Sequence, residues 1–297
     1  MKDLISIADL DSDELQKLIK SALWLKQAGK KKLLEGKVLA LLFEKPSLRT
    51  RVSFDVAMNQ LDGHALMLSQ AEVGLGEREP IADMARVLSR YVDGIVARTF
   101  DHQRVALLAK HATVPVINGL TDEEHPCQAL SDLLTIQEKK RGLEGLSIAY
   151  VGDANNVANS LLLACPLVGM EFRIASPKGY GPKERVLAQA QKSGGQILLT
   201  EDAKQAVEDA DVLYTDVWTS MGQEAEAERR RASFAGYQVN QELLSLAKRD
   251  AIFMHPLPAH HGEEIAEGLL ESPQSVVFDQ AENRLHMQKA ILVKLLG

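Results

Sequence analysis

Apolar residues recur along most of this chain with two different periods. Near the start they fall three or four positions apart, which predicts a helix over residues 12–28. Asp11 followed by Glu14 resembles a capping box at the start of this helix, and Gly29 is a typical stop. The apolar face of the helix comprises Leu15, Leu18, Ile19, Ala22 and Leu25.

Short apolar runs typical of buried strands follow, in two series separated by helical patterns. The first series comprises residues 38–43, 65–68, 94–98 and 114–118, with helices predicted near 50–61, 80–91 and 102–111. The second series comprises residues 146–151, 172–175, 196–199, 212–215, 251–254 and 276–278. Strands that alternate with helices indicate parallel sheets covered on both faces.

A helical stretch near residues 128–140 separates the two series and indicates a division of the chain. We therefore predict an α/β fold with two domains, each a mostly parallel sheet flanked by helices. The first domain would comprise residues 1–138, with a C-terminal helix over residues 283–297 packing back onto it. The second domain would comprise residues 139–282.

Composition limits the class of protein and its partners. The 297 residues are 45% hydrophobic and 25% charged, which is typical of globular proteins. The 34 Lys and Arg against 41 Asp and Glu give a net charge of −7, which argues against a nucleic acid or an anionic membrane as main partner. A few arginines can still form a local site for a small anion.

The chain shows no pattern that favours secretion or membrane insertion. Its first apolar stretch contains acidic residues, so we expect no secretory signal, and the apolar run over residues 161–170 is too short to span a bilayer. Cys127 and Cys165 give neither a disulfide framework nor a metal-ligand spacing. We expect a cytoplasmic protein.

Polar residues gather where the strands of the first series end. Ser47, Arg49, Thr50 and Arg51 follow the first strand at the predicted start of a helix, where free backbone N–H groups favour a phosphate or carboxylate. The segment contains no glycine, so it is not a Walker loop. The alternative is that Ser47 only caps the helix and the arginines lie on the surface.

Two further strand ends in this series carry candidate site residues. Arg98 ends the third strand, and His125 and Gln128 follow the fourth, three positions apart at the start of a helix. Because the carboxyl ends of parallel strands share one edge of a sheet, these side chains predict a converging anion site. A lone histidine at such a place would more often be structural.

The second series offers other polar residues at its strand ends. Residues 152–156 (GDANN) stand where a dinucleotide fingerprint would lie, but Ala154 and Val157 replace two of its glycines, so a nicotinamide site is disfavoured. The two asparagines could instead bind a carboxylate, and Asp216 offers a carboxylate to an ammonium group. Residues 255–258 (HPLP) leave carbonyls that could accept from a ligand amide, or form a rigid turn. The charge run over residues 223–231 is interpreted as a solvated helix or mobile loop.

In combination, these motifs resemble the ornithine carbamoyltransferase family over essentially the whole chain. The matching segments are residues 47–51 (SLRTR), 125–128 (HPCQ), 216–222 (DVWTSMG), 255–258 (HPLP) and 282–284 (ENR). The first, second and fourth are shared with aspartate carbamoyltransferases, whereas the Ser-Met-Gly segment favours ornithine.

The resemblance implies a role for each candidate residue. Carbamoyl phosphate would contact Ser47, Leu48, Arg49, Thr50, Arg98, His125, Gln128, Pro256, Leu257 and Arg284, with backbone groups acting at Leu48, Pro256 and Leu257. L-Ornithine would contact Asn156, Asp216, Ser220 and Met221. The catalytic groups would be Thr50, Arg98, His125 and Arg284.

The resemblance also implies the reaction and the assembly. The side-chain amine of ornithine would attack the carbamoyl group directly to give citrulline and phosphate, in the synthesis or breakdown of arginine. Guanidinium groups would neutralise the leaving phosphate, so we expect no cofactor and no metal. The family forms homotrimers or multiples of trimers.

Three positions depart from the family pattern. Leu48 replaces a threonine, which matters little if that position acts through its backbone N–H. Gly74 stands where a glutamine would reach a neighbouring subunit, and Pro256 replaces a cysteine placed near the attacking amine. We interpret the chain as an ornithine enzyme that works without this thiol. The alternatives are a carbamoyltransferase acting on aspartate, putrescine or a modified ornithine, a catalytically silent scaffold and, more remotely, a dehydrogenase.

Overall fold

The computed structural model describes residues 1–297, and its strands form two separate parallel sheets. One compact unit, unit 1, comprises residues Met1–Leu134 and Glu282–Gly297, and the other, unit 2, comprises Thr135–Ala281. Unit 1 contains the four-stranded sheet and unit 2 the five-stranded sheet, each with helices around it. The predicted fold class is therefore confirmed.

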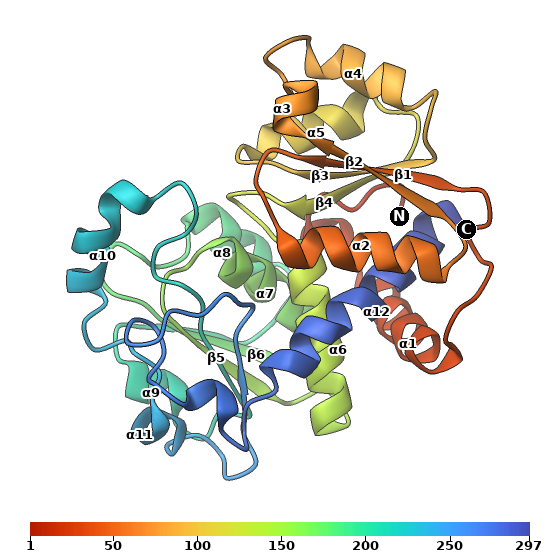
Figure 1. Cartoon of the computed structure of the whole chain (residues 1–297). Helices are drawn as coiled ribbons and strands as arrows, with labels where there is room; N and C mark the ends of the chain where they lie inside the picture. Colours follow the sequence, from red (N-terminus) through yellow and green to blue (C-terminus); the bar gives the residue numbers. More distant parts are fainter. The chain divides into compact units, whose positions relative to one another are not determined.

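Unit 1 has the strand order β2-β1-β3-β4, with every pair parallel. Its elements are α1 (Ser12–Ala28), β1 (Val38–Phe43), α2 (Leu48–Gln60), β2 (His64–Ser69), α3 (Gln70–Val73), α4 (Ile81–Leu88), β3 (Gly94–Arg98), α5 (His102–His111) and β4 (Val116–Leu120). In this unit α4 and α5 lie on one side of the sheet, and α2 lies on the other (Figure 1).

The chain passes from unit 1 to unit 2 within α6 (Pro126–Lys140) and returns within α12 (Val277–Leu296). The end of α12 packs onto the unit 1 sheet, since a Cβ atom at Gly94 of β3 would lie 2.8 Å from a methyl group of Leu296. In the middle of the sheet β3 is buried along its whole length. Burial on both faces explains why such strands are apolar throughout rather than alternating.

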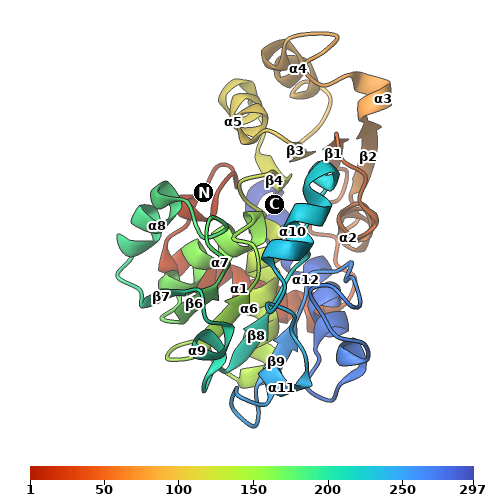
Figure 2. The same ribbon diagram turned by 90° about the vertical axis from the view of Figure 1, so that its left-hand side faces the viewer.

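Unit 2 has the strand order β7-β6-β5-β8-β9, again all parallel, and Figure 2 shows β6 beside β7 and β8 beside β9. Its elements are β5 (Ser147–Val151), α7 (Asn156–Leu167), β6 (Glu171–Ala175), α8 (Glu184–Gln191), β7 (Ile197–Thr200), α9 (Ala203–Val207), β8 (Val212–Tyr214), α10 (Ala227–Ser233), α11 (Gln241–Leu244) and β9 (Ile252–Met254). Residues of α9 and α11 share one apolar core with β5, β8 and β9.

One predicted strand is wrong. Residues 276–278 do not form a strand, because α12 already begins at Val277, and only Ser275 makes an isolated bridge, to Phe253. A run of three apolar residues cannot distinguish a strand from the buried start of a helix. The other nine strands are confirmed, each with ends within two residues of the prediction. None of the helices combines the length and the apolarity needed to cross a membrane.

Candidate functional site

The strand order identifies where loops meet at the carboxyl edge of each sheet. In unit 1 the chain passes from β1 to β2 on one side and from β3 to β4 on the other. The loops after the adjacent strands β1 and β3 therefore leave the sheet side by side and diverge. Ligands of open α/β sheets bind at this kind of switch point. The two loops are joined directly, because the Glu44 N–H donates to the Arg98 carbonyl at 2.8 Å.

The loop after β1 leads straight into α2. The Ser47 hydroxyl oxygen caps this helix by accepting from the Thr50 N–H at 3.2 Å, and the following amides of the first turn point out of the helix end. The Leu48 side chain is 75% exposed, so this residue can serve an anion at the helix end only through its backbone. The helix end and the side chain of Arg49 together favour negative charge here.

Four cationic or titratable groups form one cluster near this helix end: Arg49, Arg98, His125 and Arg284. Burial, followed by the charges of Arg284 and Arg49, lowers the pKa of Arg98 to about 9. Burial, followed by the charges of Arg284, Arg98 and Arg49, lowers the pKa of His125 well below its usual range. The structure therefore brings three guanidiniums and a neutral imidazole together, and we call these four residues the cationic cluster.

Two contacts orient groups beside the cationic cluster. Arg284 donates from Nη2 to the Thr50 hydroxyl oxygen at 2.7 Å, which leaves the hydroxyl proton of Thr50 available for another acceptor. Gln128 is buried in the first turns of α6 and donates from Nε2 to the Asp132 carboxylate at 2.8 Å. The predicted site residues Thr50 and Gln128 thus lie in unit 1, as the cationic cluster does.

Lys45 is a buried residue of this region that the sequence interpretation missed. Its ammonium group pairs with the Asp122 carboxylate and lies 4.0 Å from the centre of the Phe100 ring. Burial lowers the pKa of Lys45, and the charge of Arg98 acts in the same direction. Lys45 ties together the segments that follow β1, β3 and β4. A single lysine in a loop carries no pattern that would have revealed this.

Asp216 forms the centre of the polar residues at the switch point of unit 2, between β5 and β8. Its carboxylate accepts from the Asn155 side-chain amide at 2.7 Å and from the Val217 N–H at 2.8 Å. Burial raises the pKa of Asp216, and its electrostatic interaction with the His255 ring and these hydrogen bonds oppose that effect. The predicted Asn156 begins α7, but Asn155 is the residue that binds Asp216, a contact that the sequence did not reveal.

The Ser-Met-Gly segment follows Asp216 as an irregular turn. The Ser220 N–H donates to the Gln223 side chain at 3.1 Å, whereas the Met221 side chain is exposed. The charge run that continues from it is not simply solvated, because Arg230 of α10 is buried. Arg230 donates to the Asp153 carboxylate at 2.8 Å and to the Trp218 carbonyl at 2.9 Å.

The segment after β9 places Pro256 and Leu257 in unit 2, together with Asp216. The Leu257 N–H donates to Nδ1 of His255 at 2.9 Å, and Leu257 adopts a left-handed backbone with φ of 56°. A non-glycine residue held in this region is uncommon and clusters at functional sites. The predicted contacts of these two carbonyls with carbamoyl phosphate remain a prediction.

Gly74, one of the two departures from the family pattern in unit 1, has a local structural role. It ends α3 with φ of 58°, which glycine adopts without strain, and a Cβ atom there would lie 2.7 Å from the Arg78 side chain. A glutamine at this position would be strained in this backbone conformation and would have to displace the Arg78 side chain.

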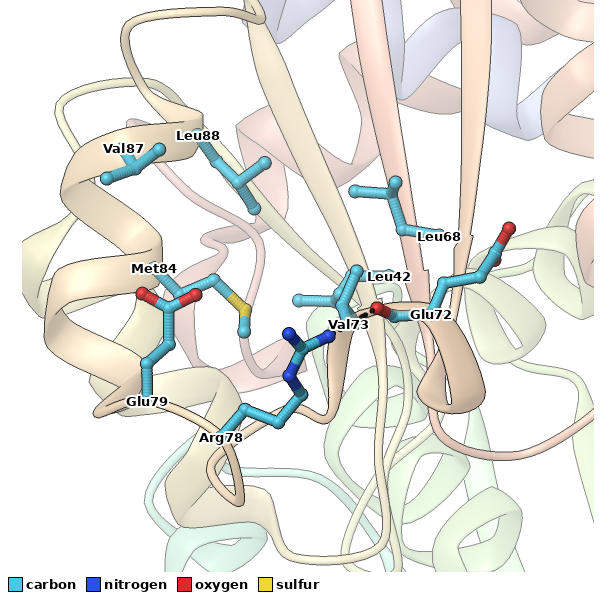
Figure 3. A pocket seen from close by; sticks show the side chains of 9 residues that line it. All are labelled: Leu42, Leu68, Glu72, Val73, Arg78, Glu79, Met84, Val87 and Leu88. Atoms are coloured by element: carbon cyan, nitrogen blue, oxygen red, sulfur yellow. Dashed lines mark hydrogen bonds between the residues drawn. The ribbon is translucent and has the colours of Figure 1, made fainter.

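A cavity of about 360 Å³ in unit 1 lies apart from the predicted site residues. None of them lines it, and Figure 3 shows mainly aliphatic side chains with Arg78 directed towards the backbone of α3. Its lining comprises Leu42, Leu68, Glu72, Val73, Arg78, Glu79, Met84, Val87 and Leu88. This cavity is therefore not the site formed by the cationic cluster.

Comparison with known proteins gives matches over the whole chain. The family model for "Aspartate/ornithine carbamoyltransferase, carbamoyl-P binding domain" matches residues 2–138, and that for the "Asp/Orn binding domain" matches residues 144–295. An ornithine carbamoyltransferase of Anoxybacillus flavithermus is 55% identical and covers 99% of this chain and 96% of its own length. An anabolic ornithine carbamoyltransferase of Pyrococcus furiosus is 53% identical over 100% of this chain and 96% of its own. The solved structure of an ornithine carbamoyltransferase from Pyrococcus furiosus superposes with a TM-score of 0.96, at 53% identity, covering 100% of this chain and 97% of that one.

Proposed function

This chain belongs to the aspartate/ornithine carbamoyltransferase family and is a carbamoyltransferase, and we propose that its acceptor is L-ornithine. The reaction then converts carbamoyl phosphate and L-ornithine into L-citrulline and phosphate in arginine metabolism. Two relatives that share more than half of their residues with this chain carry the name ornithine carbamoyltransferase, and one of the two is called anabolic.

The cationic cluster at the start of α2 is the observation that carries the proposal. The charges of Arg284 and Arg49 lower the pKa of Arg98, so holding these guanidiniums together is costly, and a bound dianion would offset this repulsion. In the proposed complex, the phosphate of carbamoyl phosphate accepts hydrogen bonds from the Ser47 hydroxyl, from the amides of Leu48 and Arg49, and from the Arg49 guanidinium. The Thr50 amide joins them by turning from the Ser47 oxygen, to which it donates in the free chain. Each charge-assisted bond contributes about 1.5–3 kcal/mol.

The carbamoyl oxygen develops negative charge when the amine attacks its carbon. Arg98, His125 and the Thr50 hydroxyl would donate to this oxygen, and Arg284 would hold the Thr50 hydroxyl in place through its 2.7 Å contact. One such donor is typically worth about 2.7–4 kcal/mol in the transition state. The carbamoyl NH₂ would donate to the carbonyls of Pro256 and Leu257 and lie near Gln128.

L-Ornithine would bind in unit 2. Asp216, oriented by Asn155 and the Val217 N–H, would accept from the ammonium group at the amino-acid end of ornithine. Asn156, Ser220 and Met221 would complete the contacts with this end. We further propose that the carbamoyl-phosphate domain comprises residues 1–138 with 283–297, and that the ornithine domain comprises residues 139–282.

The attacking amine must be neutral. A free side-chain ammonium titrates near about 10.4, so the enzyme selects or creates the deprotonated form. Removal of water lowers the pKa of an amine, whereas a nearby carboxylate raises it, so Asp216 would orient ornithine rather than deprotonate it. The leaving phosphate could take the proton.

The assembly proposed is a homotrimer or a multiple of trimers, in the cytoplasm. A stripe of exposed apolar side chains, the α2 stripe, supports self-association: Leu48, Val52 and Val56 on α2 and Leu66 on β2 are 75%, 48%, 36% and 43% exposed. The number three comes from the family likeness. Both cysteines are buried, and neither forms a disulfide.

A panel of amines tests the acceptor. The purified chain is incubated with carbamoyl phosphate and L-ornithine, N-acetylornithine, putrescine or L-aspartate, and the carbamoylated products are quantified. We expect product with L-ornithine alone. Product from another amine and none from ornithine would overturn the proposed acceptor while retaining the family. Absence of any binding heat with carbamoyl phosphate would instead favour a silent scaffold.

A further inference from the structure

A tight turn after β9 gathers three potential metal ligands outside the groups that the proposed reaction uses. The Glu263 N–H donates to the His260 carbonyl at 3.1 Å, and the Gly262 N–H donates to the Ile265 carbonyl at 2.8 Å. This turn places ligand atoms of His260, Glu263 and Glu264 within 4.8 Å of one another. We call these three residues the turn cluster.

Glu264 is fully buried, and its two oxygens differ in their partners. Oε1 accepts from the His260 N–H at 2.6 Å and lies 3.2 Å from Nε2 of His255. Because Nδ1 of His255 accepts from the Leu257 N–H, the ring proton is on Nε2 and is donated to Glu264. Oε2 of Glu264 is closed off from solvent and has no hydrogen-bond partner, although the His260 Nδ1 atom lies 3.8 Å from it.

A buried carboxylate oxygen without a donor is costly unless a cation compensates it. The other two members of the turn cluster leave a route for such a cation, since the side chains of His260 and Glu263 are 49% and 25% exposed. Arg231 donates from Nε to Oε1 of Glu263 at 2.9 Å. That contact orients the carboxylate and leaves Oε2 as a donor atom for a metal.

We propose that the turn cluster binds one divalent transition-metal ion of the Zn²⁺ type per chain. Imidazole nitrogen and carboxylate oxygens are ligands that zinc accepts, and three protein ligands leave a position for water. His255 and Arg231 would act as outer partners that orient Glu264 and Glu263, as is usual around bound metals. The ion takes no part in the carbamoyl transfer, so the site is additional to the proposed function and does not depend on it.

Calorimetric titration of the chelator-treated full chain with ZnCl₂ tests this site, together with the visible spectrum of bound Co²⁺. We expect one ion per chain, and weakening by more than about tenfold in His260→Ala and in Glu263→Gln, since loss of even an outer partner costs about 10–100-fold. His261→Ala is the matched control: it removes the adjacent imidazole, which pairs only with Glu267 at 3.4 Å.

Comparison of His260→Ala with His261→Ala distinguishes zinc binding at the turn cluster from unspecific binding to surface histidines. Unchanged zinc affinity in His261→Ala, with loss in His260→Ala, supports the site. No binding heat in the unaltered chain overturns the proposal, as does an equal loss in both histidine variants or no loss in His260→Ala. Circular dichroism of each variant confirms that it is folded, and carbamoyl-phosphate binding provides a separate readout for the proposed function.

Discussion

Arg49 and Asp216 test the assignment of the two substrates at the scale of single residues. Arg49→Ala should weaken carbamoyl-phosphate binding by about 10–100-fold or more, because one or more charge-assisted bonds of about 1.5–3 kcal/mol are lost. Asp216→Ala should leave that binding within about twofold and abolish binding of L-citrulline in the presence of phosphate. Calorimetry with each ligand measures both effects. Loss of the same ligand in both variants would contradict the assignment.

His125 should remain a neutral imidazole throughout the physiological pH range. Burial and three guanidiniums lower its pKa well below 6.5, so it gains a proton only at much lower pH. Because His125 does not titrate near pH 6.5, it should add no acidic limb there to the dependence of the rate on pH. The rate should instead rise towards alkaline pH as the ornithine amine deprotonates. The ¹⁵N shifts of the His125 ring report its protonation directly. A titration of this ring near pH 6.5 would refute the prediction.

The lowered pKa of His125 also makes the free energy of unfolding depend on pH. The unfolded chain protonates this histidine near pH 6.5, whereas the folded chain does not, so the unfolded state binds more protons at acid pH. His125 therefore destabilises the fold as the pH falls below about 6.5, and its contribution is constant above that value.

At the scale of elements, α10 and the Ser-Met-Gly turn are joined by Arg230. Its contacts with Asp153 and the Trp218 carbonyl hold the start of the turn against the loop after β5. Arg230→Met leaves the buried Asp153 carboxylate without this partner, a change that typically costs about 3–5 kcal/mol. We expect the KM for ornithine to rise by more than about tenfold, with carbamoyl-phosphate binding nearly unchanged.

Arg229→Met provides the matched control for Arg230. Arg229 precedes it on the same helix, but its side chain is 69% exposed and pairs only with Glu226, at 3.2 Å. Such surface pairs contribute about 0–1 kcal/mol, so this variant should behave like the unaltered enzyme. Equal effects of the two substitutions on the KM for ornithine would show that the buried contact is not the cause.

At the scale of the whole molecule, the α2 stripe should determine the assembly. Val52→Glu places a charge in the middle of this stripe, where burial against a second copy would leave it unpaired. We expect the molar mass from light scattering to fall from that of a trimer or larger assembly to that of one 32.6 kDa chain. Leu107→Glu, on the exposed side of α5, should leave the assembly unchanged. An intact assembly in Val52→Glu would exclude the stripe as interface.

The amino-acid sequence by itself determined the strands, and it indicated that the candidate site residues lie at the carboxyl edge of each sheet. Apolar periodicity depends on local geometry, so nine strands were predicted within two residues of their ends, and polar residues such as Arg98 and Asp216 could be assigned to strand ends. The failure at residues 276–278 came from a run too short to have a period.

Only the tertiary structure decided which polar groups are buried and what they contact. Asn155 binds Asp216, Arg230 of the charge run forms a buried ion pair with Asp153, and Lys45 joins three loops. The physical reason is that burial and pairing are set by residues distant in sequence: 61 positions separate Asn155 from Asp216, and 77 separate Arg230 from Asp153. A local pattern contains no information about such partners.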